Sequence, residues 1–211
     1  MQYSLIDNVI NEFDRSIRTL FSGWQVAKRE NPARQQPEPQ LDKKTIKHVA
    51  GLMRVNHTGE VCAQALYQGH ALTSRCPQTK QQMQDAAEQE VDHLVWCEQR
   101  LQQLNDHPSR FNPLWYTGSL AIGLAAGILG DRWSLGFVEE TEYQVIRHLD
   151  EHLNELPEND HKTRVLLQQL REDEAHHANT AHSAGAAPLP GIIKKLMQCT
   201  AKMMTKTVYW I

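Results

Sequence analysis

Two Glu-x-x-His motifs on the apolar faces of helical segments constrain the fold of this chain more than any other feature. The pairs are Glu90 with His93 and Glu174 with His177. In a helix, side chains three residues apart point the same way, so each pair can reach one ion. Neighbours on these faces are apolar: Met83, Ala86, Ala87, Leu94, Cys97, Leu101 and Leu104 for the first, Leu167, Leu170 and Ala181 for the second. A buried carboxylate is costly unless it is paired or bound to a metal, so the sequence predicts a polar or metal site in a helical core.

Two other acid–histidine pairs compete with these motifs. Glu158 and His161 follow Pro157 in a polar turn, so we exclude them. Asp173 and His176 give the second motif a different register, but the helical face of that pair is less apolar and includes Gln169 and Thr180. We therefore prefer the register in which Glu174 and His177 face the core.

Two further core-facing glutamates complete a recognisable set. Glu60 shares its face with Met53, Ala63 and Tyr67, and Glu142 shares its face with Leu135, Val138, Val145 and Leu149. One glutamate from each of two helices, with Glu-x-x-His from each of two others, is the pattern of di-iron and di-manganese carboxylate bundles. Four carboxylates balance two divalent ions, and mainly oxygen ligands favour iron or manganese over zinc or copper. Spacing alone leaves Glu139, one turn before Glu142, as an alternative.

The remaining sequence predicts an all-α protein, a ferritin-like four-helix bundle with extra terminal amphipathic helices. The four bundle helices are expected at 43–73, 78–105, 132–156 and 160–183. Residues 1–42 are expected to form a separate N-terminal part. They comprise an amphipathic helix at 4–21, with Leu5, Ile6, Val9, Ile10, Phe13, Ile17 and Leu20 on its apolar side, and a Pro-rich linker at 23–41. The metal-binding domain is expected over 43–211 and ends in a helix at about 192–210.

The chain resembles the demethoxyubiquinone hydroxylases of ubiquinone biosynthesis over most of its length after about residue 45. The most specific element is Arg-Val-Asn-His-Thr-Gly-Glu at 54–60, which resembles the family signature N/D-H-A/T-G-E. Tyr67, the Leu114–Trp115 pair and both Glu-x-x-His motifs also fit. In the family's third block a histidine follows the glutamate by six residues, as His148 follows Glu142. The resemblance therefore selects Glu142 over Glu139.

The resemblance implies a ligand set and an activity. Glu60, Glu90 and His93 are expected on one iron ion and Glu142, Glu174 and His177 on the other, with Glu90 and Glu174 bridging. The expected enzyme is an O2-dependent monooxygenase that hydroxylates the ring of a demethoxyubiquinone or demethoxyubiquinol. An external electron donor is required, and no G-x-G-x-x-G dinucleotide fingerprint is present in the chain. Tyr67 and His148 are candidates for hydrogen bonds to the ligands, but residues of this kind are more often ordinary core residues, so neither belongs to the ligand set.

Two segments suggest contact with a membrane. Residues 111–130 contain no charged residue, but Gly118, Gly123, Gly127 and Gly130 make them a poor autonomous helix. We interpret this segment as a lipid-dipping or substrate-covering connection, with a buried core connection as the alternative. The last helix carries Ile192, Ile193, Leu196, Met203, Met204 and Ile211 on one side, Trp210 nearby, and Lys195, Lys202 and Lys206 on another side. Such a cationic amphipathic helix suits an anionic membrane surface.

We therefore expect a peripheral protein on the cytoplasmic face of the cell membrane, acting on a membrane-embedded polyprenyl quinol. Four cysteines without a C-x-x-C pair fit a reducing compartment. Other ubiquinone-biosynthesis proteins are expected partners. Nucleic acid is not, because a net charge of -3 lacks the basic excess that nucleic-acid binding needs. The alternatives are another ferritin-like di-metal protein, for iron oxidation and storage or as a manganese catalase, and a non-enzymatic membrane-associated helical protein.

Overall fold

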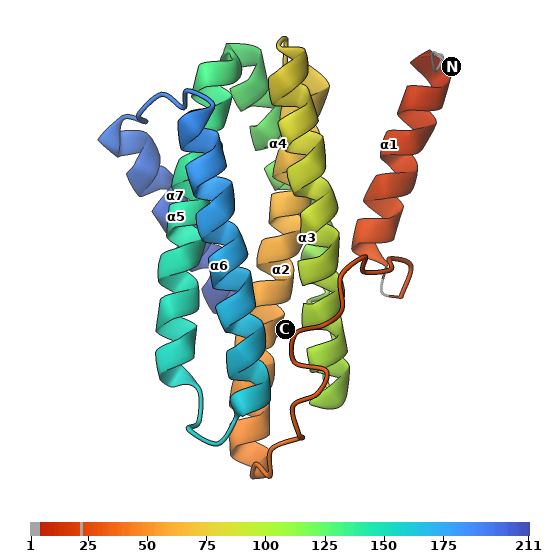
Figure 1. Cartoon of the computed structure of the whole chain (residues 1–211), viewed down its shortest axis with the longest axis vertical. Helices are drawn as coiled ribbons and strands as arrows, with labels where there is room; N and C mark the ends of the chain where they lie inside the picture. The colour runs from red at the N-terminus through yellow and green to blue at the C-terminus, as the bar shows by residue number, and fades with distance from the viewer. Residues whose placement is uncertain (1–4, 22) are drawn as a thin grey trace.

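The computed structural model describes residues 5–21 and 23–211, and all regular elements in this part of the chain are α-helices. They are α1 (Leu5–Leu20), α2 (Lys43–Thr73), α3 (Pro77–Gln103), α4 (Asn112–Leu129), α5 (Asp131–Glu155), α6 (His161–Ser183) and α7 (Gly191–Val208). Figure 1 shows α2, α3, α5 and α6 running alongside one another, while α1 stands beside the bundle. The predicted all-α, ferritin-like bundle with extra terminal helices is confirmed.

Local signals in the sequence explain where the bundle helices begin. The side chain of Asp42 accepts a hydrogen bond from the Thr45 amide at 2.7 Å and caps α2. Asp160 caps α6 in the same way through Thr163, and Pro77 occupies the first turn of α3, where its missing N–H costs nothing. The first residue of the predicted 4–21 helix lies outside the described residues, as do the side chains of Leu5, Ile6 and Val9.

Besides a small cluster that joins α2 and α3 to α4, the bundle core contains two apolar clusters. One gathers Val49, Met53, Trp96, Leu101, Leu149, Leu166, Leu167 and Leu170, and the other gathers Ala63, Tyr67, Met83, Ala87, Leu135, Val138 and Ala181. Each of the four bundle helices contributes to both clusters and therefore crosses the interval between them. That interval falls at 54–62 on α2, 88–95 on α3, 139–148 on α5 and 171–180 on α6, and all six predicted ligands lie within it.

The apolar segment after α3 forms the helix α4 and packs along α2. Its glycines, which disfavour an isolated helix, allow the two backbones to approach closely. A Cβ on Gly123 would lie 2.5 Å from the Leu66 carbonyl oxygen, and a Cβ on Gly69 would lie 2.7 Å from the Leu120 carbonyl oxygen. Tertiary packing thus supplies the stability that the local sequence lacks. The helix ends at Gly130, whose φ of +116° suits glycine and turns the chain into α5.

The side of α4 that faces away from α2 leaves large apolar side chains exposed. Leu114 is 66% exposed, Ile128 62% and Leu129 73%. A fully buried core connection is therefore wrong for 111–130, since one side of the helix is packed on α2 and the other is open. Lipid or substrate contact on the open side stays a prediction. None of the described helices combines the length and the hydropathy needed to cross a membrane.

Substitution of Gly123 by alanine tests the close packing of α4 on α2. We expect a loss of about 1–3 kcal/mol in the free energy of unfolding, because the new methyl group meets backbone atoms that cannot move aside. Gly118→Ala is the matched control, since nothing lies within 4 Å of the place that its methyl group would occupy; we expect it to gain about 0.5–1 kcal/mol from helix propensity. Urea denaturation measures both, and equal effects at the two positions would contradict this packing.

Candidate metal centre

All six sequence-predicted ligands meet in one buried cluster. Glu60 comes from α2, Glu90 and His93 from α3, Glu142 from α5, and Glu174 and His177 from α6. Their donor atoms form two groups, each lying within 4.8 Å of one another: Glu60, Glu90, His93 and Glu174 in the first, and Glu142, Glu174 and His177 in the second. These residues are distant in sequence, from α2 to α6. They meet because all four bundle helices pass through the same level of the core, between the two apolar clusters.

Glu90 and Glu174 lie between the two histidines. Glu90 places Oε2 3.0 Å from His93 Nδ1 and Oε1 3.1 Å from His177 Nδ1. Glu174 places Oε1 3.3 Å from His93 Nδ1 and Oε2 3.1 Å from His177 Nδ1. Each carboxylate thus directs one oxygen to each imidazole, which is the arrangement that two bridging carboxylates would need.

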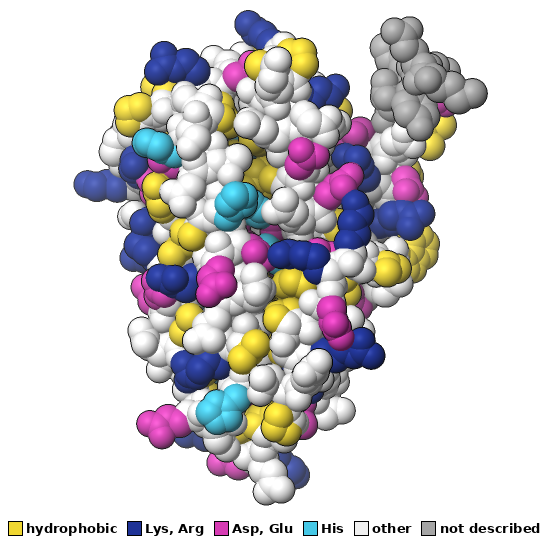
Figure 2. Space-filling view, in the orientation of Figure 1, with side chains coloured by type: hydrophobic (Ala, Val, Ile, Leu, Met, Phe, Trp, Pro, Cys, Tyr) yellow, Lys and Arg dark blue, Asp and Glu magenta, His cyan; other side chains and the backbone are white. Residues whose placement is uncertain are grey.

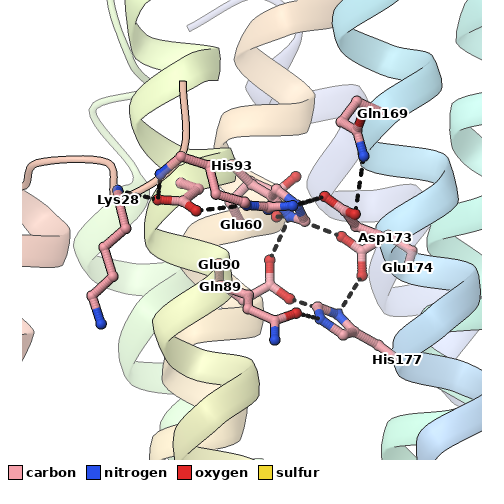
Figure 3. A network of polar contacts seen from close by, with 11 residues as sticks. Lys28, Glu60, Gln89, Glu90, His93, Gln169, Asp173, Glu174 and His177 are labelled. Carbon is pink, nitrogen blue, oxygen red and sulfur yellow. Dashed lines mark hydrogen bonds and ion pairs between the residues drawn. The ribbon is translucent and has the colours of Figure 1, made fainter. Parts of the chain in front are cut away.

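Both imidazoles are oriented by a partner on the opposite side of the ring. His93 Nε2 lies 2.9 Å from an oxygen of Asp173, and His177 Nε2 lies 2.8 Å from the side-chain oxygen of Gln89 (Figure 3). A hydrogen bond donated from Nε2 leaves the Nδ1 lone pair directed into the cluster, where a metal ligand must present it. The outer partners therefore favour the tautomer that binds a metal through Nδ1.

The two outer glutamates differ in their surroundings. The Tyr67 hydroxyl donates a 2.6 Å hydrogen bond to Glu142 Oε1, whereas Glu60 Oε2 lies 3.7 Å from His93 Nδ1. Tyr67 therefore makes the contact for which it was a candidate. His148 does not: its ring packs against His152, and its Nε2 has no hydrogen-bond partner among the described residues.

The competing residues lie outside the cluster. Glu139 accepts a hydrogen bond from the exposed His182 at 2.9 Å, and Glu158 and His161 are exposed next to the turn between α5 and α6. His176 is also exposed.

Asp173, which belongs to the disfavoured register, nevertheless contributes to the cluster as the outer partner of His93. The face of the helix predicts which residues can be ligands, but it does not predict which residues bond those ligands from outside. A signal was present, since the polar residue directly before each Glu-x-x-His motif, Gln89 or Asp173, bonds the histidine of the other motif.

The charges of the cluster balance without a metal because protons take the place of cations. Burial, reinforced by neighbouring carboxylates, raises the pKa of Glu60 and Glu142 well above the usual value. Burial also acts against ionised Glu90 and Glu174, but the nearby imidazolium groups outweigh it and lower both pKa values. Against the same burial effect, hydrogen bonds and charges of Glu174 and Glu90 raise the pKa of His177 to about 11.

The donor set fits divalent ions of the harder first-row metals. Glu90 Oε1 is buried, and its close partner is His177 Nδ1 at 3.1 Å, so both atoms are directed at a position that a metal ion could take between them. Four carboxylates and two imidazoles can hold two divalent ions with near-neutral total charge, once the ions replace the protons. This arrangement defines a class: a ferritin-like bundle with a buried carboxylate–histidine site able to hold metal.

Comparison with known proteins assigns the chain to a family within that class. Residues 47–208 match the family described as Ubiquinone biosynthesis protein COQ7. A protein of Pseudomonas fluorescens is 54% identical over 211 residues, covering 99% of this chain and 97% of its own, and one of Acinetobacter baumannii is 52% identical over 209 residues, covering 99% of each. Both are named 3-demethoxyubiquinol 3-hydroxylase, as is a Legionella pneumophila relative that is 52% identical over 209 residues and covers 99% of this chain and 98% of its own. The chain belongs to the COQ7 family.

The protons held by the metal-free cluster predict how its stability depends on pH. His177 and Glu60 both have higher pKa values in the folded state than in the unfolded state. Their contribution to the free energy of unfolding is therefore full below the unfolded-state pKa, and it is lost as pH rises toward the folded-state pKa. We expect the metal-free protein to lose unfolding free energy between pH 7 and pH 10. Glu60→Gln keeps the neutral form at every pH, so its stability should fall less steeply. Denaturant titrations with chelator present measure both slopes, and a stability that rises with pH over this range would contradict the assignment.

Proposed function

We propose that this chain is a di-iron monooxygenase that hydroxylates the ring of a demethoxyubiquinol-type quinol with O2, a late step of ubiquinone biosynthesis. The observation that carries the proposal is the pair Glu90 and Glu174, each directing one oxygen to each histidine. The names of the full-length relatives support the substrate and the reaction. Manganese catalase and iron storage share the metal chemistry, but none of these three relatives carries such a name.

The proposed ligands are Glu60, Glu90 and His93 for one iron and Glu142, Glu174 and His177 for the other, with the two central glutamates shared. Two ferrous ions bound there would supply the electrons and the binding site for O2, and an external donor of unidentified chemistry would restore the electrons. One oxygen atom of O2 enters the ring and the other leaves as water, so each turnover consumes two electrons from that donor.

The protein's own contribution is to hold the ligands in place and exclude water. The two apolar clusters lie above and below the site along the bundle, so charges in the site are screened less than they would be in solvent. The hydrogen bond from Tyr67 fixes one oxygen of Glu142 and leaves the other for a metal. Outer hydrogen bonds at Nε2 orient both imidazoles before any ion arrives, which lowers the cost of assembling the site.

We further propose that the chain works as a peripheral protein on the cytoplasmic face of the cell membrane. A polyprenyl quinol resides in the bilayer, so the enzyme must reach the lipid surface. On α7, Ile192 is 70% exposed, Leu196 60% and Met203 58%, and on α4 the unpacked side is equally apolar. Lys195, Lys202 and Lys206 on α7 are exposed as well, which suits anionic headgroups.

The choice between neighbouring glutamates on α5 tests the proposed ligand set. Glu142→Gln should lower hydroxylation at least 100-fold and reduce bound iron below two ions per chain, because it removes a ligand charge inside the cluster. Glu139→Gln, one turn away, should retain both, since that side chain bonds His182 instead. Metal analysis of the purified proteins, with quinone profiles of a deletion strain carrying each variant, measures the outcome. If the strain with Glu139→Gln accumulated demethoxyubiquinol and the strain with Glu142→Gln did not, the ligand set would be wrong.

Substitution on α7 tests membrane binding. Leu196→Glu should weaken binding to anionic phosphatidylglycerol vesicles about tenfold or more, because it removes an apolar side chain from the lipid contact. Gln198→Glu adds the same charge at an exposed position about 200° further round the helix and should have a smaller effect. Co-sedimentation gives both affinities, and a wild-type protein that stayed in the supernatant would end the proposal.

A further inference from the structure

Residues 23–41, which we term the strap, join α1 to α2 across the outside of the metal site. Figure 1 shows the strap passing in front of the lower part of α3 and then beside α6 before it reaches the start of α2. It precedes the region matched to the family, which begins at residue 47. The face that it crosses carries charged side chains of both signs (Figure 2).

Specific contacts hold the strap although it has no regular structure. Ala33 is buried in the apolar cluster below the site, and the Lys28 amide donates a 2.6 Å hydrogen bond to Asp92 Oδ1. At the far end of the strap, Glu38 pairs with the buried Arg100 at 2.6 Å. These anchors lie on either side of Arg29, so they fix the backbone there and determine where its side chain lies.

Arg29 reaches from the strap to the outer edge of the site. Its Nε donates to Asp92 Oδ2 at 2.7 Å and its Nη1 donates to Asp173 Oδ2 at 2.8 Å. Its Nη2 lies 3.3 Å from His93 Nε2, and its guanidinium carbon lies 4.8 Å from the centre of the Trp96 ring. One guanidinium therefore joins α3, through Asp92, to α6, through Asp173.

We propose that Arg29 is a positioning residue for the metal ligand His93. It holds Asp173 at His93 Nε2, so that the ring keeps Nδ1 directed at the metal position. The inference rests on the proposed function, because it concerns a ligand of the proposed iron site.

The alternatives open to Asp173 explain why a cation is needed there. Asp173 Oδ1 also accepts a hydrogen bond from Gln169 at 3.1 Å, so the carboxylate has a second partner on its own helix. Asp92 is buried on the facing helix, and the two negative charges would repel without a cation between them. The planar fork of arginine can bond both carboxylates at once, whereas a lysine ammonium is a single point charge.

The other half of the site is held differently. His177 Nε2 meets the neutral amide of Gln89 rather than a carboxylate. A carboxylate partner makes an imidazole a stronger ligand than an amide partner does. Arg29 thus acts on one of the two proposed metal positions, the one shared by Glu60, Glu90 and His93.

The rate of iron release tests the role of Arg29 independently of catalysis. Anaerobic protein loaded with two ferrous ions is mixed with excess bipyridine, and the coloured complex is followed over time. Arg29→Ala should release one of its two ions about 10-fold to 100-fold faster than wild type, and Arg29→Lys should be intermediate. Arg34→Ala is the matched control, because Arg34 lies on the same strap and pairs with exposed Glu30, away from the site; its release rate should equal that of wild type.

Two further measurements separate positioning from a general loss of structure. Because Arg29 is about 40% exposed, free guanidinium at millimolar concentration should enter the gap in Arg29→Ala and slow the release again. Combined with Asp173→Asn, Arg29→Ala should add little further acceleration, since both act through one contact. Additive effects, a wild-type rate in Arg29→Ala, or equal acceleration in Arg34→Ala would overturn the inference. Wild-type protein that bound no iron would instead overturn the proposed function.

Discussion

Six ionisable side chains lie buried between two apolar clusters, and the cost of that burial shapes the rest of the molecule. An isolated charge in such surroundings is strongly unfavourable, so each carboxylate of the set has either a proton or an imidazolium partner when no metal is bound. Two divalent ions can take over the role of these protons. The same arrangement therefore allows six ionisable groups to be buried together and leaves their oxygen and nitrogen atoms close enough to hold metal ions.

The need to hold this cluster explains features some distance from it. Each histidine is oriented by the residue that precedes the motif on the opposite helix, so α3 and α6 position one another's histidines. The strap adds a cation on the outside of this pair of helices. On another side of the bundle, α4 packs against α2, which carries Glu60, through glycines that allow close backbone contact.

The sequence predicted the parts of this arrangement that depend on periodicity. The predicted bundle helices agree with the observed bounds within two residues, because caps and prolines mark them. The faces of Glu90 and Glu174 could be assigned because their helical neighbours are apolar. Glu142 could not be separated from Glu139 by spacing, since both lie one turn apart on similar faces; burial against Tyr67 distinguishes them in the structure.

Other contacts could not be predicted because they join segments that are distant in sequence and carry no periodic pattern. Arg29 lies in a Pro-rich segment whose composition is typical of a linker, and its partners are 63 and 144 residues away. The helix α4 depends on its contact with α2 rather than on its own glycine-rich sequence. Interpretation of His148 as an outer partner of the ligands rested on the family resemblance, and its ring packs against His152 instead.

The central claim is that Glu90 and Glu174 together bridge two iron ions. Diffraction from crystals loaded anaerobically with ferrous iron, recorded on both sides of the iron absorption edge, locates the ions directly. If the two glutamates bridge the ions, the maps contain two anomalous peaks about 3.5–4 Å apart, with an oxygen of Glu90 and of Glu174 bound to each. A single peak, or iron bound elsewhere on the chain with these glutamates still paired to the histidines, would contradict the claim.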